Sequence, residues 1–128
     1  EIDTESLENL FKEALKKDDL KLKVENLKSD EVSAMIELSE QSRRMQEMSA
    51  MYGMDNRTFP SDETLVLNAN NNVVKLLLDI KDERKDEVEM ICRQIYDLAV
   101  MSHKPLSQEE MTEFISRSNK IMELLAEK

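Results

Sequence analysis

This sequence of 128 residues has few of the residue types from which metal and phosphate sites are built. It contains one cysteine and one histidine, so it offers no internal disulfide and no pair of such ligands for zinc. Its single glycine leaves no glycine-rich loop to hold the phosphates of a nucleotide. The acidic run Asp79–Arg84 lacks the spaced oxygen ligands and the glycine of a calcium loop. We therefore predict neither catalysis nor a bound metal or cofactor in this segment.

The charge and the apolar pattern exclude two classes of partner. A net charge of −10 repels the phosphate backbone of nucleic acids. No apolar run approaches the length of a membrane span, and no signal peptide is present, so we expect no membrane partner and a reduced, cytoplasmic setting. The length suits one domain over residues 1–128. Because the chain opens with Glu1 instead of an initiator methionine, we expect it to be part of a longer chain.

Start and stop signals place most of the helices. Asp3 or Thr4 begins a first helix that ends at Asp18-Asp19, and a second helix runs over 40–52 and stops at Gly53, which favours the left-handed conformation. The run Asn70–Asn72 caps a third helix, which carries Val73 to Ile80.

Between these helices the apolar period changes from helical to two. Leu20, Leu22 and Val24 alternate with charged residues, which predicts a half-buried strand over Leu20–Leu27. Two further apolar runs, Ala34–Leu38 and Thr64–Asn68, complete a three-stranded sheet. We therefore predict an α+β fold in which a small sheet packs with helices.

The last third of the chain predicts a pair of helices, near 87–102 and 107–126. Ser107 and Glu110 have the spacing of a capping box, which makes the start of the second helix the clearest boundary in the chain. Both helices are apolar on more of their surface than one neighbour covers. Either the last helix packs only on its own domain, or two copies of the pair close a four-helix bundle about a two-fold axis. For the bundle we predict an interface of Ile95, Leu98, Ala99, Met111, Phe114, Ile115, Ser118, Ile121, Met122 and Leu125.

Methionines recur at three-residue intervals in the helix before Gly53. Each such step turns the side chain by about 60°, so the methionines form a broad apolar band interrupted by charged residues. Methionine suits a surface that accepts different partners, but it also fills gaps in small cores, so both readings stay open. The residues predicted for partner contact are Met45, Met48, Met51, Tyr52 and Met54.

Cysteine and histidine are the side chains most often found at reactive sites, but we predict no such role for the cysteine or the histidine of this chain. Cys92 lies on the apolar face between Ile91 and Ile95, which predicts a buried and unreactive thiol. His103 lies in the turn between the last two helices, where we expect it to be solvated.

The order of these elements resembles the carboxy-terminal domain of the heat shock protein 90 family, especially its bacterial form. The similarity rests on Ser42–Met48 followed by Gly53, on Glu63–Asn68 leading into the helix at Val73, on Ile95–Ala99 and on Phe114–Asn119, and it covers essentially the whole chain. One departure is that Ala69 and Asn71 stand where the family usually has proline and histidine.

The resemblance implies a homodimerisation domain of an ATP-dependent chaperone. Its last two helices would pair with those of a second copy, and its methionine helix would contact unfolded client proteins. The ATP and magnesium of such a chaperone belong to an amino-terminal domain that this segment lacks. Two other classes of function stay open: a monomeric helical adaptor that binds partner proteins through the methionine surface, and a small enzyme, for which the sequence shows no polar constellation.

Overall fold

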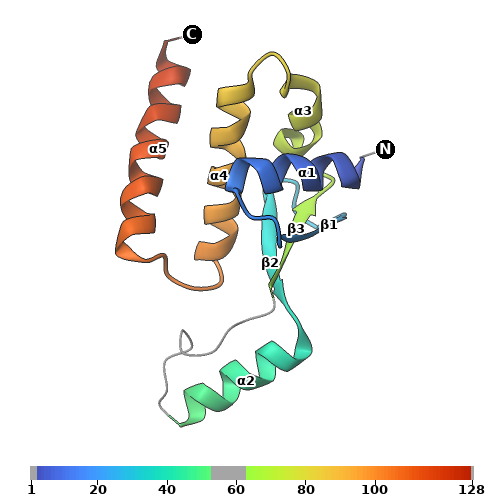
Figure 1. Cartoon of the computed structure of the whole chain (residues 1–128), viewed down its shortest axis with the longest axis vertical. Coiled ribbons are helices and arrows are strands. Elements are labelled where there is room, and N and C mark those ends of the chain that lie inside the picture. The colour runs from blue at the N-terminus through green and yellow to red at the C-terminus, as the bar shows by residue number, and fades with distance from the viewer. Residues whose placement is uncertain (1–2, 53–62, 128) are drawn as a thin grey trace.

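The computed structural model describes residues 3–52 and 63–127, and these form five helices and one three-stranded sheet (Figure 1). Along the chain the elements are α1 (Thr4–Leu15), β1 (Lys21–Glu25), β2 (Ala34–Leu38), α2 (Glu40–Met51), β3 (Glu63–Asn68), α3 (Asn72–Ile80), α4 (Lys85–Met101) and α5 (Gln108–Ala126). The predicted α+β fold is confirmed. The predicted helix stop at Gly53 lies outside the described residues.

The sheet is mixed and has the strand order β1-β3-β2. Strand β3 lies at the centre, parallel to β1 and antiparallel to β2, and its residues Leu65, Val66 and Leu67 are all buried. A continuous apolar run of this kind is typical of a central strand. Strand β1 ends at Glu25, earlier than predicted, because the backbone N–H of Leu27 donates to the side chain of Asn68 and no longer to the sheet.

One hydrophobic core joins α1, the sheet, α3 and α4. Helix α1 contributes Leu7, Phe11 and Ala14, and α3 contributes Val74 and Leu77. Helix α4 contacts α1 and β2, and contributes four core residues at helical spacing: Val88, Cys92, Ile95 and Ala99. Helix α5 and the described side chains of α2 supply no residue to this cluster.

Local hydrogen bonds begin α1, but its end was not predicted correctly. Asp3 accepts hydrogen bonds from the hydroxyl and the backbone N–H of Ser6, and these bonds lower the pKa of the Asp3 carboxyl. The helix ends at Leu15, before the predicted Asp18-Asp19. Lys16 turns the chain in the left-handed conformation with φ of 57°, although it is not glycine.

Asparagines build the corner between β3 and α3. Asn68 is fully buried: its Oδ1 accepts from the backbone N–H groups of Leu27 and Asn70, and its Nδ2 donates to the carbonyls of Ser29 and Val32. Asn71 accepts from two backbone N–H groups of the first turn of α3, as the predicted cap requires. The corner is therefore fixed by side-chain hydrogen bonds in the absence of a proline.

Candidate functional site

The start of α5 is set by the predicted capping box. Ser107 Oγ accepts from the backbone N–H of Glu110 at 3.1 Å, and Glu110 Oε1 accepts from the backbone N–H of Ser107 at 2.9 Å. The bond to the backbone of Ser107 lowers the pKa of the Glu110 carboxyl. Leu106, directly before the cap, is buried. These contacts fix the direction in which α5 returns along α4 (Figure 1).

Helix α5 has 19 residues, and none of them is buried. Its main neighbour among the described elements is α4. The residues predicted for the interface divide into two groups: Met111, Phe114, Ser118 and Ile121 are half-buried, whereas Ile115, Met122 and Leu125 are exposed by 53%, 57% and 62%. The exposed three follow helical spacing, and we call them the outer stripe of α5. The outer stripe is apolar surface that this chain leaves uncovered.

On α4 the structure corrects part of the predicted interface. Ile95 and Ala99 are only 4% and 1% exposed and belong to the core of the protomer. The reason is their spacing with Val88 and Cys92, which places them on the face of α4 that forms the core. Of the three predicted residues on α4, Leu98 is the exposed one.

A polar cluster holds α5 against α4. Arg117 donates to Asp97 Oδ2 at 2.9 Å and to Gln94 Oε1 at 3.2 Å, and Gln94 donates to Ser118 Oγ at 2.9 Å. The side chains of Arg117 and Asp97 are only 10% and 14% exposed, so their ion pair is shielded from solvent. The sequence carries no local signal of this cluster, because Arg117 and Asp97 lie on different helices and share no short motif. The cluster fixes how α5 rests on α4, and hence how its outer stripe is presented.

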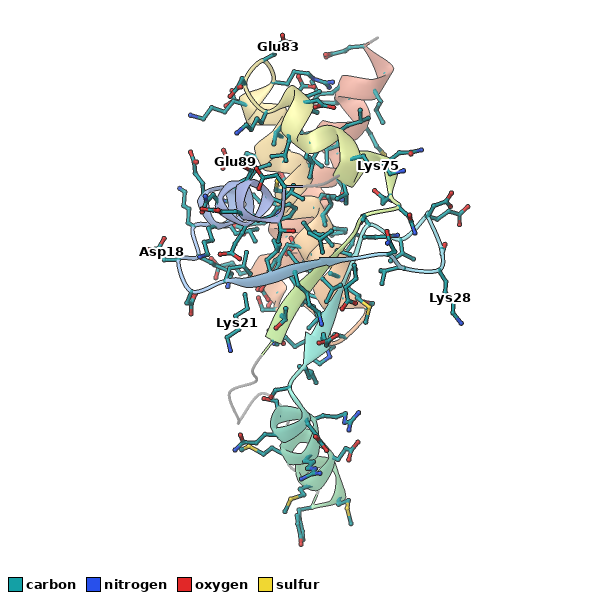
Figure 2. The ribbon with its side chains drawn as sticks, turned by 90° about the vertical axis from the view of Figure 1, so that its right-hand side faces the viewer. Asp18, Lys21, Lys28, Lys75, Glu83 and Glu89 are labelled. Atoms are coloured by element: carbon teal, nitrogen blue, oxygen red, sulfur yellow. The ribbon has the colours of Figure 1, made fainter. Side chains whose placement is uncertain are left out.

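The methionine helix α2 lies apart from the core. Figures 1 and 2 show it extending from the end of β2. No other described element makes extensive contact with it. Met48, Met51 and Tyr52 are exposed by 56%, 83% and 75%, while Met45 is half-buried. The fifth predicted contact residue, Met54, lies outside the described residues. Core filling therefore does not explain Met48 and Met51.

A charged cluster joins the α4–α5 turn to the start of β3. His103 Nε2 and Lys104 Nζ lie 3.2 Å and 3.3 Å from Glu63 Oε2. The His103 side chain is only 16% exposed, so the prediction that it is solvated is wrong. Its Nε2 is buried and makes no well-aligned hydrogen bond within the described residues, although Glu63 Oε2 lies close to it. Burial, with Glu63 nearby, raises the pKa of Tyr96 to about 12.

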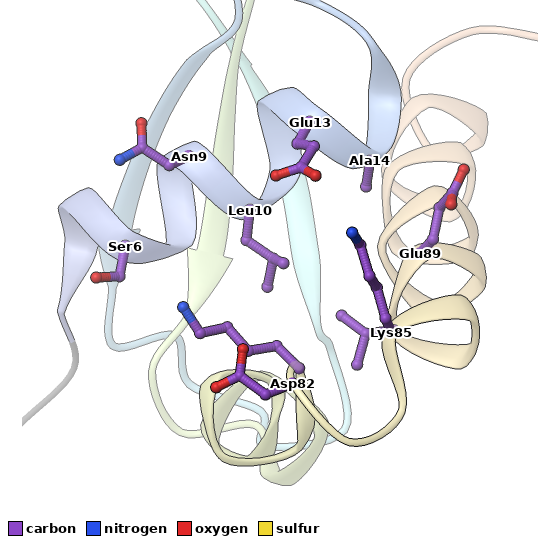
Figure 3. Close-up of a pocket in the computed structure, with 10 residues that line it drawn as sticks. Ser6, Asn9, Leu10, Glu13, Ala14, Asp82, Lys85 and Glu89 are labelled. Atoms are coloured by element: carbon purple, nitrogen blue, oxygen red, sulfur yellow. The ribbon is translucent and has the colours of Figure 1, made fainter.

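A pocket of about 350 Å³ lies between α1 and the corner joining α3 to α4 (Figure 3). Glu13 of α1 lines it opposite Asp82, Lys85 and Glu89, so charges of both signs surround it. Such a mixed lining shows no preference for an anion or a cation.

The remaining chemical groups are few. Cys92 is fully buried, as predicted, and burial raises the pKa of its thiol to about 12, which leaves it protonated and a poor nucleophile. Over residues 3–52 and 63–127, no three acidic, cysteine or histidine side chains come together to hold a metal ion. In the same part of the chain no helix is long and apolar enough to cross a membrane.

The site is thus a pair of surfaces: the outer stripe of α5 with Leu98, and the exposed methionines of α2. In comparisons with known proteins, the chain matches no protein-family model and no curated protein.

Proposed function

We propose that this chain is the homodimerisation and client-contact module of an ATP-dependent chaperone of the heat shock protein 90 type, acting in the cytoplasm. ATP and magnesium would be handled by a separate amino-terminal domain, and this segment would bind no cofactor. The observation that carries the proposal is the uncovered apolar surface of α5, a helix of 19 residues without one buried side chain.

The first part of the proposal concerns dimerisation. An isolated helix in water is only marginally stable, and most helical stability in proteins comes from packing an apolar face. Helix α5 packs one side on α4 and leaves Ile115, Met122 and Leu125 uncovered. A second copy related by a two-fold axis brings an identical apolar stripe, which completes a four-helix bundle from two α4–α5 pairs. The polar cluster around Arg117 supports this role, because it holds α5 in one orientation before a partner arrives.

The second part concerns client proteins. Met48 and Met51 expose flexible, polarisable side chains that adapt to differently shaped apolar segments. Tyr52 adds an amphipathic ring at the end of the same helix. Because no described apolar side chain of α2 belongs to the hydrophobic core, its exposed surface is free to vary without loss of the fold.

Sedimentation equilibrium of this chain over a micromolar dilution series tests the first part. We expect a reversible monomer–dimer equilibrium. A monomer at every concentration would reject the dimer and favour the monomeric adaptor.

The second part is tested with the double variant Met48→Ser/Met51→Ser. We expect the double variant to unfold at nearly the same temperature as the unchanged chain. Its loss in free energy of unfolding should be well below the roughly 2–5 kcal/mol that truncating one buried large side chain costs. Suppression of the aggregation of heat-unfolded citrate synthase, followed by light scattering, should weaken. The matched control is Met35→Ser, which removes a 39% exposed methionine from β2. Protection that falls equally in the control and in the double variant would reject α2 as the client surface.

A further inference from the structure

The methionines of the chain differ widely in exposure. Met51, Met122 and Met48 are exposed by 83%, 57% and 56%, whereas Met90 and Met111 are half-buried. Met122 belongs to the outer stripe of α5, which the proposed dimer covers, so Met48 and Met51 are the two most accessible described thioethers of the dimer. Both belong to α2, a helix that extends away from the core (Figure 2).

We propose that Met48 and Met51 are a reversible oxidation site, at which peroxide converts the apolar client surface of α2 into a polar one. This inference rests on the proposed function of α2. It adds a modification and a class of reactant, namely two-electron oxidants that donate one oxygen atom, such as hydrogen peroxide.

The chemistry is an oxygen transfer. A lone pair of the methionine sulfur attacks one oxygen of hydrogen peroxide, so that an S–O bond forms and the O–O bond breaks. The proton on the transferred oxygen passes to the departing oxygen, which leaves as water. Sulfur is oxidised by two electrons to the sulfoxide, and the peroxide is reduced by two. Methionine sulfoxide reductase reverses the change with a dithiol, which gives up two electrons and becomes a disulfide while the oxygen leaves as water.

The structure explains why oxidation would be directed to α2. The single thiol of the chain, Cys92, is fully buried and its pKa is raised, so it has neither the access nor the thiolate form that peroxide requires. The half-buried methionines are less accessible to the oxidant. Met48 and Met51, by contrast, are open to solvent in the folded chain.

The consequence for binding follows from polarity. A sulfoxide oxygen is a hydrogen-bond acceptor, and covering it with an apolar client segment leaves it without a partner. Because neither side chain contributes to the core, the fold tolerates the modification. Oxidation would therefore remove client binding while leaving the domain folded.

The first arm of the test maps the oxidised positions. The chain is treated with hydrogen peroxide, quenched with catalase, digested and analysed by mass spectrometry. We expect Met48 and Met51 to be oxidised at least about fivefold faster than Met90 and Met111, because access of the oxidant limits the reaction. Equal rates at these four positions would overturn the site.

The second arm measures client protection with heat-unfolded citrate synthase before and after peroxide. The oxidised chain should lose protection at unchanged thermal unfolding, and methionine sulfoxide reductase should restore it. The variant Met48→Leu/Met51→Leu keeps apolar side chains that peroxide does not oxidise, so its protection should survive the treatment. The matched control, Met35→Leu, should remain sensitive.

Loss of protection in the double leucine variant after peroxide would overturn the switch and leave the client function intact. If the untreated chain protects nothing, the client function fails and the switch fails with it. The mapping arm then still decides whether Met48 and Met51 are the modified positions.

Discussion

The dimer proposal makes a quantitative prediction for Ile115, which begins the outer stripe and is 53% exposed. Complete burial of an isoleucine side chain contributes about 1.5–3 kcal/mol, so covering the exposed half contributes about 0.8–1.6 kcal/mol. The two-fold axis doubles this to about 1.6–3.2 kcal/mol for each dimer. Ile115→Asp removes that contribution and adds two charges that must be buried without partners, which costs several kcal/mol more.

The same substitution should barely affect the isolated protomer. Ile115 is already more than half exposed, and a surface substitution of this kind usually changes the free energy of unfolding by less than about 0.5 kcal/mol. Leu76→Asp is a matched control, because Leu76 is also 53% exposed but lies on α3. Leu125→Asp, at the far end of the outer stripe, should act as Ile115→Asp does.

Sedimentation equilibrium of the three variants, with circular dichroism to confirm folding, measures the effect. We expect Ile115→Asp and Leu125→Asp to be monomeric at concentrations where the unchanged chain and Leu76→Asp are dimers. A dimer of unchanged affinity for Ile115→Asp would refute the placement of the interface on α5. Dissociation by Leu76→Asp alone would move the interface to α3.

Four further predictions follow from the described contacts. Asn68→Ala removes the four hydrogen bonds that a fully buried side chain makes to the backbone, and it should cost about 2–4 kcal/mol in chemical denaturation. The exposed Asn70→Ala should cost under about 1 kcal/mol, and equal losses in the two variants would contradict the role of Asn68. Lys16→Gly should raise the free energy of unfolding by up to about 1 kcal/mol, because glycine adopts the left-handed conformation without strain; a fall in the melting temperature would show that the lysine side chain matters more. The pKa of Glu110 is lowered in the folded state. The contribution of Glu110 to stability is therefore present above its ordinary pKa of 4.5 and is lost as the pH falls through the lower folded value. In Glu110→Gln the melting temperature should fall less steeply as the pH is lowered through this range. Calorimetric titration with ATP and magnesium should give no saturable heat, and micromolar binding would revive an enzymatic function.

The local sequence determined where most elements begin. Asp3, Asn71 and Ser107 accept hydrogen bonds from backbone groups two or three residues ahead, so each cap can be recognised from a short stretch of sequence. Alternating polarity marked β1, and the apolar run of β2 was predicted with its observed bounds. The exposed band of α2 and the apolar excess of α5 were also visible in the residue pattern, because helical periodicity decides which side chains share a face.

Tertiary structure decided what depends on distant residues. The order β1-β3-β2, the hydrogen bonds that Asn68 makes to residues about forty positions earlier and the Arg117–Asp97 pair have no local signal. The end of α1 at Lys16 required a left-handed lysine, a conformation that sequence favours only at glycine or asparagine. Packing also placed Ile95 and Ala99 in the core and left Leu98 exposed. Periodicity shows that a helix has apolar sides, but only the position of its neighbours decides which side is covered within the protomer and which is left for a partner.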